Sequence, residues 1–326
     1  MVWLAVFLCI PLFAFGATQD AITLDIGVKT IAFHDDLREK LLLTEIYYPA
    51  ENGTKSERTT TDIFDRFKEA RDSPILRSNK KYPLIVVSHG QKGDRFNLSW
   101  LLDILAGYGY IIASVDHFGA TWSNYDPEES IKRWNRTFDV SHVIDAIIKD
   151  PVFGPHIDKD KIGMIGYSLG SLTGLWLAGG IATNYRKPDV QNSLDIEMEE
   201  GLNEQAIENL DISEAKENLK DERIKAFLLL APVYGFAFSK EGLSSIRVPL
   251  LIIAASEDDR APIKENALFF KQTIPSAGMI TLSGKADHTI YLNPPSQDRF
   301  SKERREAHRI IARETLKFFH RTLKEQ

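Results

Sequence analysis

The segment that most constrains this chain is Gly166-Tyr167-Ser168-Leu169-Gly170. An apolar run, Ile162 to Ile165, precedes it, and small and apolar residues compatible with a helix follow it as far as Gly180. This order predicts a strand, a sharp turn and a helix, with the serine held in a strained backbone conformation at the turn. Glycines are needed on both sides because side chains there would collide with the strand and the helix. Ser168 is therefore a candidate nucleophile, and an ordinary glycine-rich turn is the alternative.

Predicted strands and helices alternate over most of the chain. The strands are expected at 82–88, 110–115, 162–165, 224–230, 249–255 and 279–282, and the helices at 98–106, 137–149 and 302–323. This alternation predicts an α/β fold in which helices cover both faces of a mostly parallel sheet. Two extended segments, 21–33 and 42–48, predict an antiparallel start to the sheet. The polar segment 51–81 is expected to run over the surface, with a short helix near 63–70.

Ligands of open α/β sheets bind outside the carboxyl ends of the strands. The residues just after the predicted strands are therefore the functional candidates. They are His89-Gly90-Gln91, Asp116-His117, Ser168, Ala231-Pro232, Glu257-Asp258-Asp259 and His288.

A serine hydroxyl needs a base within hydrogen-bond reach to become a nucleophile near neutral pH. His288 follows the last predicted strand, and a surface histidine beside Asp287 is the alternative interpretation. A third group must orient the imidazole, and Asp258 follows the preceding strand. The chain order Ser168, Asp258, His288 is the order of α/β-hydrolases.

Several separate motifs between about residue 42 and the C-terminus support a narrower comparison. They are 83–90 (PLIVVSHG), Gly109-Tyr110, Asp116-His117, Asp139-Val140, 166–170, Arg247-Val248-Pro249, the D-x-x-x-P at 258–262 and Asp287-His288. Together they resemble the bacterial predicted dienelactone hydrolases, which are relatives of the platelet-activating factor acetylhydrolases. The resemblance implies an eight-stranded α/β-hydrolase core and a carboxylic ester substrate.

The resemblance also implies roles for individual residues. Ser168 is the nucleophile and His288 the general base and acid, while the backbone N–H groups of Gln91 and Leu169 form the oxyanion hole. His89 is expected to support the oxyanion loop. In the platelet-activating factor acetylhydrolases the acid follows the strand after the nucleophile helix, but this chain has Ala231 there. Asp258 matches the bacterial branch instead, which weakens the case for that particular lipid substrate.

The sequence therefore predicts a serine hydrolase that cleaves carboxylic esters with short to medium acyl groups, a class that extends to platelet-activating-factor-like and other phospholipid esters. A serine peptidase or amidase would use the same triad, and a non-catalytic binding protein of this fold is a further alternative. No metal-binding cluster, phosphate loop or dinucleotide motif occurs in the sequence, so no cofactor is expected. The net charge of −6 and the lack of a basic segment argue against nucleic acid as a partner.

The first sixteen residues are apolar and end in small residues, which predicts a signal peptide cleaved before Ala17. An uncleaved anchor or a buried first strand is the alternative. We expect residues 17–326 to form one exported domain, periplasmic or secreted, without stable membrane insertion. The chain's single cysteine, Cys9, lies in the predicted signal peptide.

One insertion, about 183–223, separates the nucleophile helix from the next strand, and its acidic residues outnumber the basic ones by more than two to one. It would either cap the site or form solvated surface helices. Trp122, Tyr125 and Trp134 follow the strand that ends near Asp116. They would line a substrate pocket or pack in the core.

Overall fold

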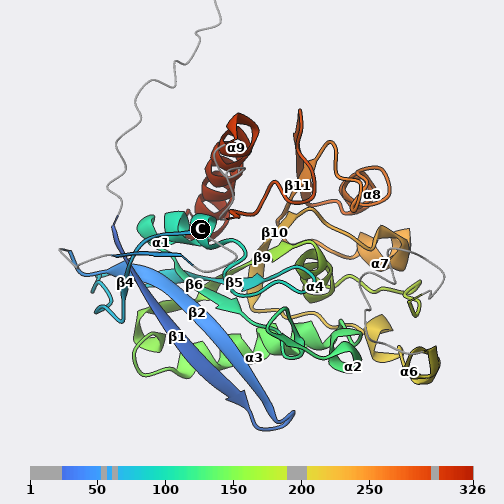
Figure 1. Cartoon of the computed structure of the whole chain (residues 1–326), viewed down its shortest axis with the longest axis horizontal. Helices are drawn as coiled ribbons and strands as arrows, with labels where there is room; N and C mark the ends of the chain where they lie inside the picture. The colour runs from blue at the N-terminus through green and yellow to red at the C-terminus, as the bar shows by residue number, and fades with distance from the viewer. Residues whose placement is uncertain (1–23, 53–56, 61–64, 189–203, 295–300, 326) are drawn as a thin grey trace, which may run out of the picture.

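The computed structural model describes residues 24–52, 57–60, 65–188, 204–294 and 301–325. These residues form a twisted sheet with helices on both faces (Figure 1). The ten strands lie in the order β12-β11-β10-β9-β5-β6-β2-β1-β4-β3. The predicted signal peptide lies outside the described residues.

Six neighbouring strands are parallel, as the alternation of predicted elements requires. They are β6 (Ile111–Val115), β5 (Tyr82–Ser88), β9 (Ile157–Tyr167), β10 (Ile224–Leu230), β11 (Leu250–Ala255) and β12 (Ala277–Leu282). Their carboxyl ends lie along one edge of the sheet. The mostly parallel α/β sheet predicted from the sequence is confirmed.

The N-terminal strands are mostly antiparallel. β1 (Asp25–Asp35) and β2 (Lys40–Ala50) form a hairpin, and β2 pairs antiparallel with β6. With the six parallel strands they make the eight-stranded core that the resemblance implies. Two further strands, β3 (Glu57–Thr60) and β4 (Asp65–Arg71), extend the sheet to ten.

The prediction of a helix near 63–70 was wrong, because residues 65–70 belong to β4; residues 63 and 64 lie outside the described ranges. β4 runs parallel to β1, with Gly27 opposite Ala70 and Val28 opposite Arg71. A short isolated helix is unstable unless it can bury an apolar face. The sequence DRFKEAR offers little apolar surface, whereas the edge of β1 offers unpaired backbone groups that a strand can satisfy.

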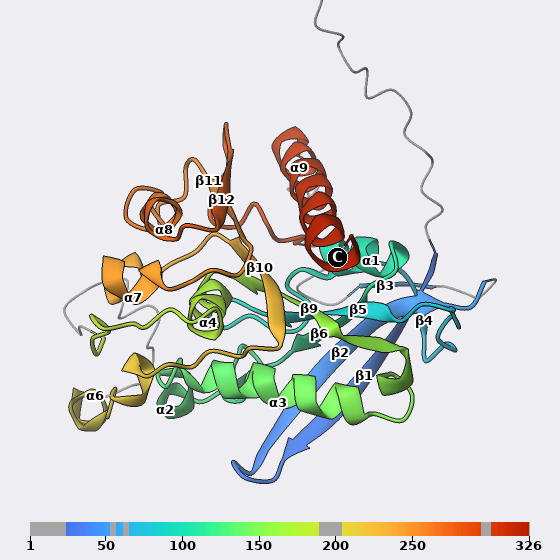
Figure 2. The ribbon, with the colours of Figure 1, turned by 180° about the vertical axis from the view of Figure 1, so that it is seen from behind.

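The helices form two layers. α1 (Ser99–Gly107) and α9 (Lys302–Phe319) cover one face of the sheet (Figure 1), and α3 (Asn135–Lys149), α4 (Leu169–Leu177), α7 (Lys240–Ser244) and α8 (Ala267–Thr273) cover the other (Figure 2). Along β5, Leu84 and Val86 pack on the α3 side, while Ile85 and Val87 pack on the α1 side. Burial on both faces explains the continuous apolar run of this strand.

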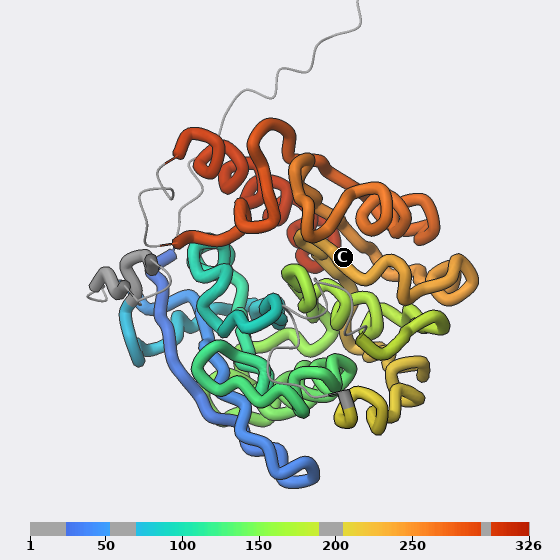
Figure 3. Tube along the Cα trace, turned by 45° about the vertical axis from the view of Figure 1, so that its right-hand side comes forward, coloured from blue at the N-terminus to red at the C-terminus, as the bar shows by residue number. Residues whose placement is uncertain are grey.

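The β1–β2 hairpin extends past the carboxyl edge of the sheet. Thr44 is opposite Val115, the last residue of β6, so the turn before Thr44 projects beyond that strand. Figure 3 shows the hairpin projecting from the body of the protein. The remaining short elements are β7 (Ala120–Thr121), β8 (Asn124–Tyr125), α2 (Pro127–Ser130), α6 (Glu204–Asn209), the 3₁₀ turns η1 (Gly154–His156), η2 (Glu214–Lys216) and η3 (Gly235–Ala237), and the π-turn η5 (His320–Lys324). Within the described ranges, every helix is too short or too polar to span a bilayer.

The insertion at 183–223 is described only in part, because residues 189–203 lie outside the described ranges. Its second half contains α6 and η2, and it is anchored to the body through two indoles. Trp134 donates from Nε1 to Glu214 Oε2 (2.7 Å), and Trp176 donates to the carbonyl of Ala215 (2.9 Å). A cavity of about 490 Å³ separates α6 from α2. Whether the insertion caps the site stays a prediction.

Candidate active site

Ser168 lies at the turn between β9 and α4, as the sequence predicts. Its backbone has φ 51° and ψ −116°, a strained conformation for a residue with a side chain. The backbone N–H of Ser168 donates to the carbonyl of Leu230 (2.9 Å), which ties the turn to the neighbouring strand β10. The turn thus projects the hydroxyl from the carboxyl edge of the sheet.

The two glycines of the turn are required by close backbone contacts. A Cβ at Gly166 would lie 2.2 Å from the carbonyl oxygen of Gly170, and a Cβ at Gly170 would lie 2.0 Å from that of Ser88. Backbone atoms cannot move aside as a flexible side chain can. This confirms the predicted reason for the glycines.

We therefore expect Gly170→Ala to lower the free energy of unfolding by more than about 3 kcal/mol, because the added methyl forces β5 and α4 apart. Urea denaturation would measure it. The matched control is Gly278→Ala in β12, where the added Cβ would meet Leu251 at an ordinary 3.5 Å. This control should change stability by less than about 1 kcal/mol. Equal losses in both variants would contradict the close contact at Gly170.

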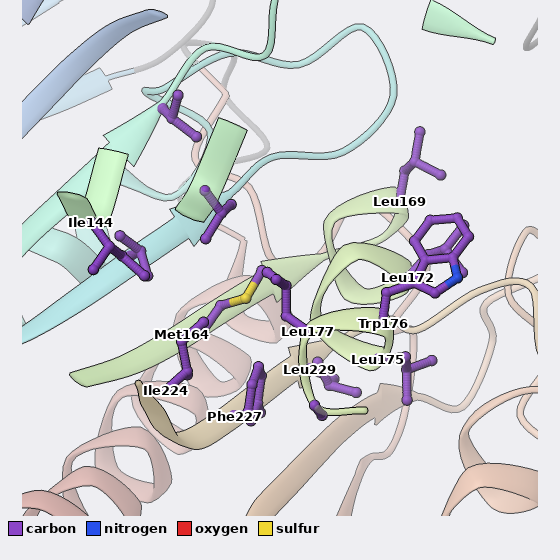
Figure 4. Close-up of a cluster of buried hydrophobic side chains, with 14 of the residues drawn as sticks. Ile144, Met164, Leu169, Leu172, Leu175, Trp176, Leu177, Ile224, Phe227 and Leu229 are labelled. Carbon is purple, nitrogen blue, oxygen red and sulfur yellow. The ribbon is translucent and has the colours of Figure 1, made fainter. Parts of the chain in front are cut away.

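Helix α4 holds the turn in place from inside the core. All nine of its residues are buried. Its leucines and Trp176 pack with Met164 from β9 and with Phe227 and Leu229 from β10 (Figure 4). Burial on all sides explains why this helix has no charged residue and no polar face, with its two hydroxyl side chains, Ser171 and Thr173, also buried.

The structure brings Ser168, His288 and Asp258 together. The hydroxyl of Ser168 donates to His288 Nε2 (2.8 Å), and His288 Nδ1 donates to both carboxylate oxygens of Asp258 (2.8 and 3.0 Å). The Asp258 side chain is 1% exposed, and the whole residue Ser168 is 8% exposed. Such a chain lets the histidine remove the serine proton while the carboxylate stabilises the resulting cation.

Two loops carry the acid and the base, and they are fastened to each other. The N–H of Glu257 donates to the carbonyl of Ala286 (2.9 Å), next to both catalytic candidates. Asp258 also accepts from the N–H of Ala261 (2.8 Å). The Tyr167 hydroxyl donates to the carbonyl of His288 (2.8 Å), and burial raises the pKa of Tyr167, so this donor stays protonated. These contacts fix the imidazole relative to Ser168.

The two expected oxyanion-hole residues lie close to the nucleophile in the structure. Leu169 is the first residue of α4, a position whose N–H has no partner within its own helix. Gln91 follows Gly90, and a Cβ at Gly90 would lie 3.1 Å from Tyr167 and 3.4 Å from the Cβ of Ser168. The loop that carries Gln91 therefore passes directly beside the serine.

The aromatic residues after β6 do not form one group. Trp134 is 3% exposed and packs edge-on against Tyr185, so it belongs to the core. Trp122 is 53% exposed and donates from Nε1 to Asp94 (3.0 Å), while Tyr125 lies beneath the ammonium of Lys92. The β7–β8 hairpin thus packs on the loop after Gln91, at the rim of the site.

Sequence reasoning missed two arginines near this loop, of which Arg136 is buried and Arg38 is half-buried. Arg136 Nη1 donates to the carbonyl of His89 (2.7 Å), and Arg38 Nη1 lies 2.8 Å from Asp139. A signal for Arg136 exists in the sequence, because it lies one turn before Val140 on the apolar face of α3. Arg38 has no such signal, since only the tertiary structure brings the β1–β2 turn against α3.

Among the described residues, no group of three or more histidine, cysteine or carboxylate side chains is arranged to hold a metal ion. The expectation that no cofactor is needed stays a prediction.

Comparison with known proteins places the chain in a family. A model of the prolyl oligopeptidase family matches residues 94–326, which include Ser168, Asp258 and His288. This chain belongs to the prolyl oligopeptidase family. It is therefore a member of the α/β-hydrolase superfamily, and of a family of serine hydrolases. The narrower resemblance to dienelactone hydrolases and platelet-activating factor acetylhydrolases is not confirmed by this match.

Individual relatives are more distant. Cutinase 2 of Thermobifida cellulosilytica is 23% identical over 203 residues, which cover 62% of this chain and 57% of the cutinase. Cutinase cut1 of Thermobifida fusca is 23% identical over the same length, covering 47% of that protein. Dipeptidyl-peptidase 5 of Porphyromonas gingivalis is 30% identical over 115 residues, covering 32% of this chain and 16% of the peptidase. The match thus spans about half the length of the cutinases.

Proposed function

We propose that this protein hydrolyses carboxylic esters through an acyl-enzyme on Ser168. The observation that carries the proposal is the hydrogen-bonded chain from Ser168 through His288 to the buried Asp258. Each step of the chain has the length of a strong hydrogen bond.

In this mechanism the Ser168 oxygen attacks the ester carbonyl while His288 Nε2 takes the hydroxyl proton. The N–H groups of Gln91 and Leu169 donate to the negative oxygen of the tetrahedral intermediate. The intermediate then expels the alcohol, which receives its proton from His288 and leaves the acyl group on Ser168. Water, activated in turn by His288, attacks the acyl-enzyme and releases the acid. Asp258 stabilises the imidazolium in both halves of the reaction.

Two findings bear on whether the substrate is an ester or an amide. The cutinases among the relatives favour an ester. The family match and the relative named dipeptidyl-peptidase 5 favour a peptide, so peptide hydrolysis is the second candidate. The triad itself would serve either reaction.

We expect nitrophenyl butyrate to be hydrolysed and the matching butyryl nitroanilide to remain at the background given by Ser168→Ala. A proline-containing dipeptide nitroanilide is the third substrate, because it tests the peptidase alternative directly. Turnover of that peptide with a higher kcat/KM than the ester would replace our proposal. Failure of a fluorophosphonate to label the wild type would instead support a non-catalytic protein.

We further propose that the preferred esters are soluble and carry short to medium acyl groups. Enzymes that act on aggregated lipid usually present an apolar surface, because burying apolar area provides the binding energy. The described part of the insertion instead exposes Glu208, Asp211, Glu214 and Glu217. These carboxylates would repel anionic lipid.

The expected result is the highest kcat/KM on nitrophenyl acetate, butyrate or octanoate, with no increase in rate above the critical micelle concentration. Each methylene that a pocket buries adds about 0.8 kcal/mol until the pocket ends, so kcat/KM should rise and then fall with chain length. A short-chain and a long-chain phosphatidylcholine complete the series and test the resemblance to the platelet-activating factor acetylhydrolases. Preference for palmitate or for the long-chain phospholipid would contradict the proposal.

Two broader expectations go with this function. The protein acts on a small-molecule ester without a nucleic-acid partner, and residues 1–16 direct its export. Sequencing the N-terminus of the mature protein should find Ala17 or a close neighbour first. Retention of Met1 would contradict cleavage.

A further inference from the structure

A second serine–histidine–aspartate chain lies behind the oxyanion loop. The hydroxyl of Ser88, the last residue of β5, donates to His117 Nε2 (2.8 Å), and His117 Nδ1 donates to Asp139 on α3 (2.9 Å). The same atom types are hydrogen-bonded in the same sequence as in the chain from Ser168 to Asp258. Ser88 is 0% exposed and His117 1%, so no substrate can reach them. This chain is therefore structural.

Burial keeps the ring of His117 neutral. Burial lowers the pKa of His117 to about 4. Burial alone would raise the pKa of Asp139, but the hydrogen bond from His117 and the charge of Arg38 hold it below its ordinary value. A neutral ring that donates from Nδ1 must accept at Nε2, as the Ser88 contact requires. His117 is thus held firmly on both sides.

The backbone of His117 in turn determines the proton position on His89. The N–H of His117 donates to His89 Nε2 (3.2 Å), so that nitrogen must be the acceptor. Burial, more than any other cause, lowers the pKa of His89 well below its usual range, and the ring is neutral. The proton of His89 therefore lies on Nδ1, which donates to the carbonyl of Gly90 (2.7 Å).

This last hydrogen bond determines how the next peptide group is turned. The peptide between Gly90 and Gln91 is trans, because the described chain contains no cis bond, and it is planar. In such a peptide the C=O and the N–H point in opposite directions. The carbonyl of Gly90 is held by His89 and also accepts from the N–H of Gly93 (3.2 Å). The N–H of Gln91 must then point away from His89.

We propose that His89 is a positioning residue that holds the Gly90–Gln91 peptide with the Gln91 N–H directed toward the oxyanion formed at Ser168. The inference rests on the proposed function and explains how the N–H of Gln91, its proposed oxyanion donor, is oriented. If this peptide turned over, the Gly90 carbonyl would face the developing negative charge and repel it. The chain from Ser88 to Asp139, with Arg136 on the His89 carbonyl, excludes that alternative by anchoring both histidines.

Two amide substitutions distinguish the roles of the two ring nitrogens of His89. The Asn amide nitrogen is as many bonds from Cβ as Nδ1 is, so His89→Asn keeps a donor for the Gly90 carbonyl. The Gln amide group is as far from Cβ as Nε2 is, so His89→Gln keeps a partner for His117 but loses that donor. Both variants leave a polar group of similar size in a buried position.

We expect His89→Gln to lower kcat roughly a hundredfold to a thousandfold with KM within threefold, the effect of losing one oxyanion donor. His89→Asn should stay within about tenfold of the wild type, because it keeps the donor. A trifluoromethyl ketone inhibitor, which adds to Ser168 and forms an oxyanion, should lose affinity in His89→Gln by the same factor as kcat/KM. A purely structural role would not produce that match.

Equal losses in the two variants, or unchanged inhibitor affinity beside a lowered kcat, would overturn the inference. Melting temperatures of both variants show whether the fold is intact. Kinetic constants and inhibitor affinities are then compared at a temperature below both unfolding transitions. Ser168→Ala is measured in parallel. If that variant stays active, the proposed function itself fails. If it is inactive while His89→Gln keeps the wild-type kcat, only the inference fails.

Discussion

Ser168→Ala is expected to lower kcat on nitrophenyl butyrate by about 10⁵- to 10⁶-fold, the loss seen when the nucleophile of a serine hydrolase is removed. No other described hydroxyl lies within hydrogen-bond distance of His288 Nε2, so no group can replace the acyl acceptor. A residual rate is expected from the oxyanion hole acting on water, on the order of a thousandfold above the uncatalysed reaction. Purified variant and wild type would be compared at equal concentration.

The fold should remain intact in this variant. Alanine loses only the hydroxyl bond to His288 and keeps both backbone bonds of Ser168, from its N–H to Leu230 and from the N–H of Ser171 to its carbonyl. The melting temperature should therefore change little. Activity within tenfold of the wild type would contradict every catalytic role assigned to the site.

Asp258→Asn is expected to lower kcat by about 10⁴-fold, because an amide can present its N–H₂ group to His288 Nδ1 and stabilise the wrong tautomer. The carboxylate accepts from His288 and from the N–H of Ala261, so asparagine still fits the site. The loss should therefore appear in kcat and not in the fold. Steady-state kinetics on the same ester would measure it.

Asp259→Asn is the matched control. Asp259 is adjacent in the sequence but exposed, and its substitution should leave kcat within about twofold. Similar losses in the two variants would show that Asp258 is not the orienting acid.

The parts of this site that the sequence predicts depend on local backbone geometry. The strand, the turn and the helix around Ser168 are specified by apolar residues and by glycines at positions where a Cβ would meet backbone atoms within about 2 Å. Asp258 and His288 were found because residues after parallel strands meet at one edge of the sheet. The same reasoning predicted the parallel sheet and its two helical layers. The turn at Ser168 depends on interactions between residues close in the chain. The positions of the acid and the base, and the parallel sheet, depend on general rules of α/β topology.

The remaining features depend on contacts between segments distant in the sequence. Residues 65–71 form β4 because they can pair with the edge of β1. The sequence of these residues alone does not predict that pairing. Trp134 lies in the core and Trp122 at the rim because Tyr185 and Asp94 lie beside them.

The hydrogen bonds behind the oxyanion loop are the clearest example of features that the sequence alone does not predict. Ser88, His117 and Asp139 come from three different elements, and burial decides that the ring of His117 is neutral. The sequence alone predicts which residues lie near the nucleophile, because the residues that follow parallel strands lie at the carboxyl edge of the sheet. Only the tertiary structure determines how the peptide groups and ring protons of these residues are oriented, because the orientations depend on contacts between distant segments, such as Arg38 with Asp139.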